Sequence, residues 1–234
     1  MRRYKKTKSY LWTQELAYIA GLFASDGCLI SNGRHLNITS KDYEIIEYCQ
    51  EALGGIGKKV QIKKGELGNL AFCWQFSDVS LYDFFNTHGI TPRKSKTIKQ
   101  VKLPNEYWGD FLRGYFDGDG TTYAYTDKRW RSSYMYYTGF TSASLDYIKW
   151  LQKQNKILCG TTQGSIKKSN RAYTLAYAKL DSEKISNAMY STACSEKFSL
   201  RRKKDRLLSF IARDKNDRIN RANARVVKLA NTQP

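Results

Sequence analysis

The sequence predicts an α+β protein made of two related αββαββα units, each with its own antiparallel sheet. Three internal matches indicate the repeat: GLFASDG at 21–27 with GYFDGDG at 114–120, the run from Thr39 with the run from Thr141, and 57–78 with 160–181. The offset between matching residues grows from 93 to 102 and 103. The second unit therefore carries about nine extra residues between its first motif and Thr141.

This repeat divides the chain of 234 residues into three parts. The predicted units are residues 1–100, which include a basic arm at 1–9, and residues 101–200. They are joined by a short linker at 101–106 that contains Pro104. Residues 201–234 form a basic extension with no counterpart in the first unit. A chain of this length has enough material for two small packed units.

The first unit begins with a predicted helix that Thr13 caps. Asn32-Gly33 has the composition of a hairpin turn between two strands. The remaining elements are expected in the order helix, two strands, helix, at 42–53, 57–64, 69–77 and 81–88. Strand alternation turns one set of side chains toward the helices: Leu36, Ile38, Val60, Ile62, Leu70, Phe72, Trp74 and Phe76.

The second unit repeats the order, with Asn105 as the expected cap of its first helix. The pattern predicts strands at 121–126 and 133–140 and helices at 145–153 and 182–190. In the extension, Leu207, Leu208, Phe210 and Ile211 predict one helix, and residues 218–231 predict a second, weaker one.

The charge balance predicts a polyanionic partner. The chain has 40 Lys and Arg against 21 Asp and Glu, a net charge of +19, with 14% aromatic residues. Nucleic acid is the first candidate and an anionic membrane surface is the second. No run of eighteen apolar residues is present, so no membrane span is expected.

The cysteines and the N-terminus indicate the compartment. Five cysteines lie far apart without a CxxC pair, which argues against a zinc finger and a disulfide framework. The basic N-terminus lacks the apolar stretch of a secretory signal. We expect a reducing intracellular compartment, either the cytoplasm or an organellar matrix, and no secretion.

Two acidic residues occupy matching positions. Asp26 and Asp119 each end the first helix of a unit, and each is followed by glycine. Small residues stand at four-residue spacing in both helices, so the two backbones can approach closely: Ala17, Gly21 and Ser25, and Asp110, Gly114 and Gly118. Packing of these helices would place the two carboxylates side by side, where they would repel unless cations or protons neutralise them.

Hard oxygen ligands favour Mg²⁺ or another divalent ion such as Mn²⁺ or Ca²⁺. Two ions could activate water and stabilise the leaving oxygen in phosphodiester hydrolysis. An EF-hand starting at Asp117 is excluded, because its twelfth position is Lys128 where a bidentate glutamate is required. Asp117 itself is read either as a peripheral ligand of a metal or water, or as a solvated residue at the helix end.

GLFASDG and GYFDGDG resemble the two motif copies of a single-chain LAGLIDADG homing endonuclease. The resemblance covers about residues 10–205. It implies two motif helices packed at the centre and two sheets that form a DNA-binding saddle. It also implies that each half cuts one DNA strand across the minor groove, leaving short 3′ overhangs. Asp26 and Asp119 would bind divalent ions, helped by the backbone carbonyls of Ser25 and Gly118.

The family also places a basic residue near each active site. By position, Lys94 and Lys197 match that residue and are the expected catalytic pair. Some relatives use a lysine after the second strand instead, and Lys41 matches that place. Ala143 stands at the corresponding position of the second unit, so this alternative lacks symmetry. A lysine that only anchors a phosphate is the competing interpretation for each of them.

Polar strand faces supply the expected DNA-reading residues, which could also be solvated positions without a role. In the first unit these are Arg34, Asn37, Lys41, Lys59, Gln61, Lys63 and Gln75. In the second unit they are Tyr123, Tyr125, Arg129, Arg131, Tyr134, Thr162, Ser165, Lys167, Arg171 and Tyr173. The extension and the arm are each read either as DNA-backbone contacts or as solvated basic segments.

The sequence therefore favours a monomeric, Mg²⁺-dependent DNA endonuclease with a double-stranded target of about two helical turns. Two alternatives remain. One is an intron maturase that binds structured RNA without cleavage. The other is a DNA-binding regulator that reuses the fold. The termini lack protein-splicing residues, which favours a free-standing or intron-encoded enzyme over an intein.

Overall fold

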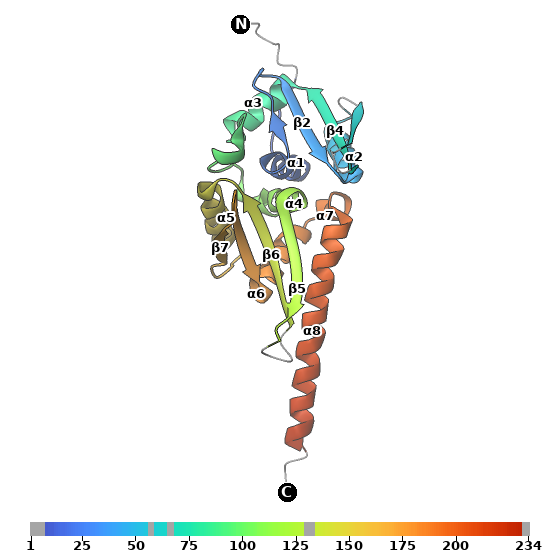
Figure 1. Ribbon diagram of the computed structural model, residues 1–234, viewed down its shortest axis with the longest axis vertical. Coiled ribbons are helices and arrows are strands. Elements are labelled where there is room, and N and C mark those ends of the chain that lie inside the picture. The colour runs from blue at the N-terminus through green and yellow to red at the C-terminus, as the bar shows by residue number, and fades with distance from the viewer. Residues whose placement is uncertain (1–7, 56–58, 65–67, 129–133, 231–234) are drawn as a thin grey trace.

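The computed structural model describes residues 8–55, 59–64, 68–128 and 134–230, with side chains described as far as residue 224. It contains two four-stranded antiparallel sheets with the same topology, in the orders β1-β2-β4-β3 and β5-β6-β8-β7. Figure 1 shows one sheet above the other, with helices α1 and α4 at their junction. The α+β class and the tandem repeat are therefore confirmed.

The first unit comprises α1 (Gln14–Ala24), β1 (Cys28–Leu29), β2 (His35–Ser40), α2 (Tyr43–Ala52), β3 (Val60–Lys64), β4 (Leu70–Ser77), α3 (Val79–Thr87) and the short 3₁₀ helix η1 (Lys94–Lys96). The second comprises η2 (Asn105–Tyr107), α4 (Trp108–Asp119), β5 (Gly120–Thr126), β6 (Tyr134–Ser142), α5 (Leu145–Leu158), β7 (Ser165–Lys168), β8 (Tyr173–Ala178), α6 (Lys179–Tyr190) and α7 (Cys194–Lys197). One long helix, α8 (Arg201–Ala230), ends the chain.

Two glycines allow the motif helices to touch backbone to backbone. A Cβ on Gly21 would lie 2.1 Å from the carbonyl oxygen of Phe111, and a Cβ on Gly114 would lie 1.9 Å from that of Tyr18. Real atoms cannot approach so closely, so only glycine fits at either position. The predicted close approach of α1 and α4 is confirmed, and it sets the distance between the two motif ends.

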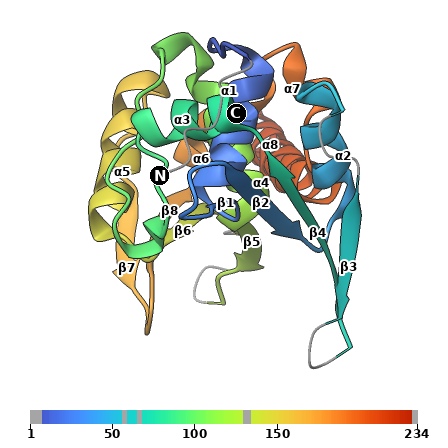
Figure 2. The ribbon, with the colours of Figure 1, turned by 90° about the horizontal axis from the view of Figure 1, so that it is seen from above.

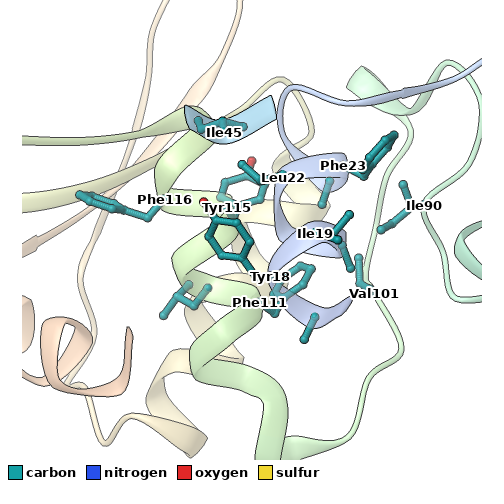
Figure 3. Close-up of a cluster of buried hydrophobic side chains, with 14 of the residues drawn as sticks. Tyr18, Ile19, Leu22, Phe23, Ile45, Ile90, Val101, Phe111, Tyr115 and Phe116 are labelled. Carbon is teal, nitrogen blue, oxygen red and sulfur yellow. The ribbon is translucent and has the colours of Figure 1, made fainter. Parts of the chain in front are cut away.

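The core is continuous through this junction. Tyr18 and Leu22 of α1 and Phe111 and Tyr115 of α4 are buried together (Figure 3). Apolar side chains from both units therefore share one cluster, and its hydrophobic free energy opposes separation of the units. Thr13 caps α1 as predicted, with its Oγ1 accepting a hydrogen bond from the backbone nitrogen of Leu16 at 3.2 Å.

Each sheet presents one face to helices and leaves the other uncovered (Figure 2). Leu36, Ile38 and Trp74 are fully buried on the helix-facing side, as predicted. The prediction is wrong for Ile62 and Leu70, which are 66% and 53% exposed. The end of the β3–β4 hairpin extends past the helices, so correct alternation there does not produce burial.

Three helix predictions are also wrong. Asn105 does not cap α4, because it opens the 3₁₀ turn η2 and the helix begins at Trp108. Helix α5 continues to Leu158, five residues past the predicted end. The extension forms the single helix α8 in place of two, and Figure 1 shows it running along β5 and past the end of the sheet. None of the described helices is long and apolar enough to cross a membrane.

Candidate active site

The two motif carboxylates lie at the end of the α1–α4 contact, as predicted. Asp26 follows α1 and Asp119 is the last residue of α4, and both are exposed. A Cβ on Gly118 would lie 3.3 Å from Oδ2 of Asp26 and 2.1 Å from Oγ of Ser25. The end of one motif is therefore packed directly against the end of the other.

Burial and neighbouring charges shift the pKa values of both carboxylates. Desolvation raises the pKa of Asp26 to about 6, and the negative charge of Asp119 adds to the rise. Desolvation also raises the pKa of Asp119. Lys94 and Lys203 oppose both rises, because a nearby positive charge favours the ionised acid. The site thus consists of two carboxylates flanked by two ammonium groups.

Lys94 holds the end of the first motif. It is buried on η1, and its Nζ donates hydrogen bonds to the carbonyl oxygens of Ser25 at 2.9 Å and Gly27 at 2.8 Å. These two carbonyls lie on either side of Asp26 in the chain. Burial lowers the pKa of Lys94, while the two aspartates raise it. The structure therefore places Lys94 where the sequence expected it, beside the first carboxylate.

Lys203 takes the equivalent place at the second motif, and Lys197 does not. Nζ of Lys203 donates to the carbonyl oxygens of Phe116, Gly118 and Gly120 at 2.8, 2.7 and 2.7 Å. The last two flank Asp119 as Ser25 and Gly27 flank Asp26. Burial lowers the pKa of Lys203, as it does for its counterpart.

The expected pairing of Lys94 with Lys197 is therefore wrong in geometry. Lys197 lies at the end of α7, where its exposed ammonium group pairs with Glu51 of α2 at 2.5 Å. The chain between α6 and α8 includes α7, which has no α-helical counterpart in the first unit. These additional residues increase the repeat offset from 103 to 109 and carry the matching lysine into α8.

Asp117 is neither a metal ligand nor a solvated helix end, contrary to both interpretations of the sequence. Its side chain is buried, and Oδ2 accepts hydrogen bonds from the hydroxyl of Tyr18 at 3.0 Å and from the backbone nitrogen of Leu200 at 2.9 Å. Asp117 thus joins α1, α4 and the residue that precedes α8. Desolvation raises its pKa to about 6 despite both hydrogen bonds.

This raised pKa predicts that Asp117→Asn stabilises the protein above pH 6. The folded state releases the proton near pH 6 and the unfolded chain near pH 3.8, so the ionised acid costs about 3 kcal/mol at pH 8. The advantage of the variant should shrink between pH 6 and pH 4 and vanish below that. Urea unfolding across this pH range measures it. The exposed Asp205→Asn serves as control and should change little, whereas an Asp117→Asn variant less stable at pH 8 contradicts the prediction.

Asp26 and Asp119 fit a divalent metal ion that takes some of its ligands from the protein and the others from a bound substrate. Within the described ranges, neither Asp26 nor Asp119 hydrogen-bonds to a protein group, and no cluster of three His, Cys, Asp or Glu side chains could hold a metal alone. The carbonyls of Ser25 and Gly118 each accept a lysine hydrogen bond and retain a second lone pair. Mg²⁺ is commonly held by one or two carboxylates together with substrate phosphate oxygens.

An open hollow lies beside the first carboxylate. Its lining includes Asp26, Lys41, Asp42 and Arg202. Arg202 of α8 donates two hydrogen bonds to the carboxylate of Asp42, at 2.7 and 2.6 Å, and these lower the pKa of that acid. The C-terminal helix therefore reaches the first unit's site as well as its own, a contribution that the sequence analysis missed.

The predicted reading residues of the first unit share the uncovered sheet face. Asn37 pairs with Gln75, and Gln61 and Lys63 lie in register on the same side. Lys59 is exposed just before β3, and Lys41 is exposed just after β2. Arg34 lies in the turn between β1 and β2 and is half-buried. One polar and basic surface therefore extends outward from the carboxylates.

The second unit meets the prediction only in part. Tyr123 and Tyr125 on β5 and Ser165 and Lys167 on β7 lie on the uncovered face, and Arg171 is exposed in the turn before β8. Thr162 lies in the loop before β7, where its hydroxyl donates to Asp181 at 2.6 Å. Arg129 and Arg131 lie outside the described residues.

Tyr134 and Tyr173 contradict the prediction. In the strand register, Tyr134 shares the face of Tyr136 and Phe140, and Tyr173 shares that of Leu175, which is the buried side of the sheet. Tyr134 is only 5% exposed because α8 covers it. Both side chains therefore belong to the packing of the second unit and are removed from the reading surface.

Comparison with known proteins identifies a domain in the first unit and a shared fold over both units. Residues 13–89 match the family model of a LAGLIDADG-like domain. No curated protein sequence matches the chain. The chain is similar to the LAGLIDADG meganuclease I-AabMI bound to uncleaved DNA, with a TM-score of 0.57 and 13% identity over 94% of this chain and 99% of that one.

Two further structures share the fold. The LAGLIDADG homing endonuclease I-LtrWI bound to target DNA gives a TM-score of 0.56 and 12% identity over 94% of this chain and 98% of that one. Full-length DUF199/WhiA from Thermatoga maritima gives a TM-score of 0.54 and 13% identity over 93% of this chain and 68% of that one. Residues 13–89 therefore carry a LAGLIDADG-like domain, and the chain shares the two-unit fold of these structures over nearly its whole length.

Proposed function

We propose that the protein is a site-specific endonuclease that cuts both strands of duplex DNA. The observation that carries the proposal is the matched pair of half-sites. Each has an exposed carboxylate, Asp26 or Asp119, at the α1–α4 contact, and each has a lysine on the adjoining carbonyls, the buried Lys94 or the half-buried Lys203. Two equivalent half-sites suit a duplex, whose two strands are related by twofold symmetry. Each half-site would cut one strand across the minor groove and leave short 3′ overhangs.

The chemistry divides between the acids and the lysines. The carboxylates would hold divalent metal ions, Mg²⁺ above all, with help from the carbonyls of Ser25 and Gly118. Ions bound there would supply positive charge at the phosphate and a water of lowered pKa. Each lysine ammonium is fixed in place before DNA arrives, so it can stabilise charge that develops on the phosphate with little reorganisation.

The uncovered sheet faces would contact the DNA. They present the polar side chains of β2, β3 and β4 in one unit and those of β5 and β7 in the other. The similar structures of I-AabMI and I-LtrWI are bound to DNA. With one unit per half-site, a single chain would read a target of about two helical turns as a monomer. The net charge of +19 supports binding to the phosphate backbone.

A cleavage selection tests the proposal. The protein is incubated with a large randomised DNA pool, with Mg²⁺ and with chelator, beside Asp26→Asn and Asp119→Asn. We expect double-strand breaks at one long motif, none with chelator, and nicks on opposite strands from the two variants. Variants that nick the same strand, or cleavage that survives chelation, would contradict the assignment of one metal-dependent site to each strand.

A DNA-binding regulator is the second candidate, because the WhiA structure shares this fold. It predicts the same bound motif from the pool, no breaks under any metal, and unchanged binding by Asp26→Asn. An intron maturase predicts tighter binding to folded RNA than to any duplex. Intact carboxylates beside two lysines that are held on backbone carbonyls favour cleavage over both, since binding alone needs neither acid.

A further inference from the structure

The first hairpin of the second unit is far longer than its counterpart. β5 and β6 pair over seven positions, from Gly120 opposite Phe140 to Thr126 opposite Tyr134. β1 and β2 pair over two positions. The extra residues between the motif and Thr141 therefore lengthen this hairpin. It starts immediately after Asp119, so it extends outward from the second carboxylate.

Helix α8 supports the lengthened hairpin from behind. Phe210 lies with its ring 6.4 Å from that of Tyr134, and the guanidinium of Arg213 lies 4.2 Å from the Tyr134 ring centre. Leu207 and Ile211, on the same side of the helix, are buried. The outer end of this hairpin, at Tyr134, packs against α8, so the extension provides apolar surface there. The described end of β6 is thereby held against α8.

The opposite face of this hairpin carries a row of tyrosines. The Tyr123 and Tyr137 rings are stacked at 5.1 Å with an interplanar angle of 13°, and the Tyr125 and Tyr137 rings at 6.1 Å and 9°. Tyr123 and Tyr125 are 41% and 46% exposed. Mutual stacking fixes their orientation, so the row presents an ordered aromatic surface to solvent.

The first unit offers a different chemistry on its uncovered face. Asn37, Gln61, Lys63 and Gln75 present amide and ammonium groups there. Such groups read base edges by hydrogen bonds. Of the four bases, thymine alone offers an apolar group in the major groove, its 5-methyl, and apolar or aromatic side chains contact it. The two faces are therefore suited to different base compositions.

We infer that Tyr123, Tyr125 and Tyr137 bind the 5-methyl groups of thymines in one half of the target. This rests on the proposed binding of duplex DNA and names its sequence class. Tyr123 and Tyr125 follow Asp119 by four and six residues, or about 13 and 20 Å of strand at ~3.3 Å per residue. The contacted thymines thus lie about four to six base pairs from the cleavage centre, at ~3.4 Å per base pair. The other half-site has no such requirement.

Binding selection with chelator present separates this inference from cleavage. The wild-type protein, the double variant Tyr123→Ser with Tyr125→Ser, and Gln75→Ala each select duplexes from a random pool. We expect a wild-type motif with thymines in one half at these positions. The tyrosine variant should lose that preference, and Gln75→Ala should relax the other half. Replacing those thymines by uracil, which lacks the methyl, should weaken wild-type binding about fivefold and leave the tyrosine variant unaffected.

Three outcomes would overturn the inference. One is a selected motif with no thymine preference in either half. Another is an equal uracil effect in the wild type and the tyrosine variant. The third is loss of preference in the same half by the tyrosine and Gln75→Ala variants. In each case a specific duplex is still bound, so the proposed function stands. Failure to select any motif would instead overturn both.

Discussion

Lys203→Met should turn the protein into an enzyme that nicks one DNA strand. Cleavage of the strand served by Asp119 should fall about 100-fold, the usual cost of removing one preorganised donor at a transition-state charge. Cleavage of the strand served by Asp26 should persist, because Lys94 and its carbonyl contacts are on the other motif. Duplexes labelled separately on each strand, resolved on denaturing gels, measure the two rates.

Lys197→Met is the matched control for this experiment. It makes the same chemical change six residues earlier, at an exposed side chain paired with Glu51. It should cut both strands at wild-type rates. Slower cutting by this control, with equal strand rates in Lys203→Met, would return the catalytic role to Lys197. Thermal unfolding of both variants separates lost chemistry from lost fold, since Lys203 also hydrogen-bonds to three backbone carbonyls.

Gly114→Ala should be the most destabilising single-methyl change among the described helix contacts. The new Cβ would lie 1.9 Å from the carbonyl oxygen of Tyr18 and 3.2 Å from the nitrogen of Leu22. Both contacts are backbone atoms of α1, so the two helices must separate and the shared core loses contacts. We expect a loss of about 3 kcal/mol or more, at the upper end for overpacking. Denaturant unfolding measures the loss.

Gly33→Ala is the control for the cost of adding a methyl alone. Gly33 has a φ of +77° but nothing within 4 Å of its Cβ position, so only the strained backbone should cost stability, about 1 kcal/mol. A Gly114→Ala variant no less stable than this control would mean that α1 and α4 are not in backbone contact. The relative placement of the two carboxylates would then have to be revised.

The repeat in the sequence predicted most of the fold and half of the active site. Matching segments fixed the element order, the α1–α4 contact and the positions of Asp26, Asp119 and Lys94. The offset of 103 did not identify Lys203, because the additional residues between α6 and α8 raise the offset to 109 at this position. The pairs Arg93-Lys94 and Arg202-Lys203 were the available clue, since each places a lysine directly after an arginine and beyond the last strand of its unit.

Strand faces were predictable only where the two sides differ chemically. β2 alternates apolar and polar residues, and its buried side was predicted correctly. β6 carries tyrosines on both sides, so alternation could not decide which side Tyr134 joins. The deciding contact is with α8, which is far away in sequence. Tertiary contacts of this kind also buried Asp117, whose partners are Tyr18 and Leu200.

The position of Lys203 on α8 has a consequence during protein synthesis. The first motif end has its lysine once Lys94 has left the ribosome, whereas the second waits for Lys203 of α8, which follows every strand of both sheets. A chain that stops early therefore has both aspartates but only one lysine, and its second unit lacks the apolar face of α8. The two equivalent motif ends are therefore completed 109 residues of synthesis apart, the first with Lys94 and the second with Lys203.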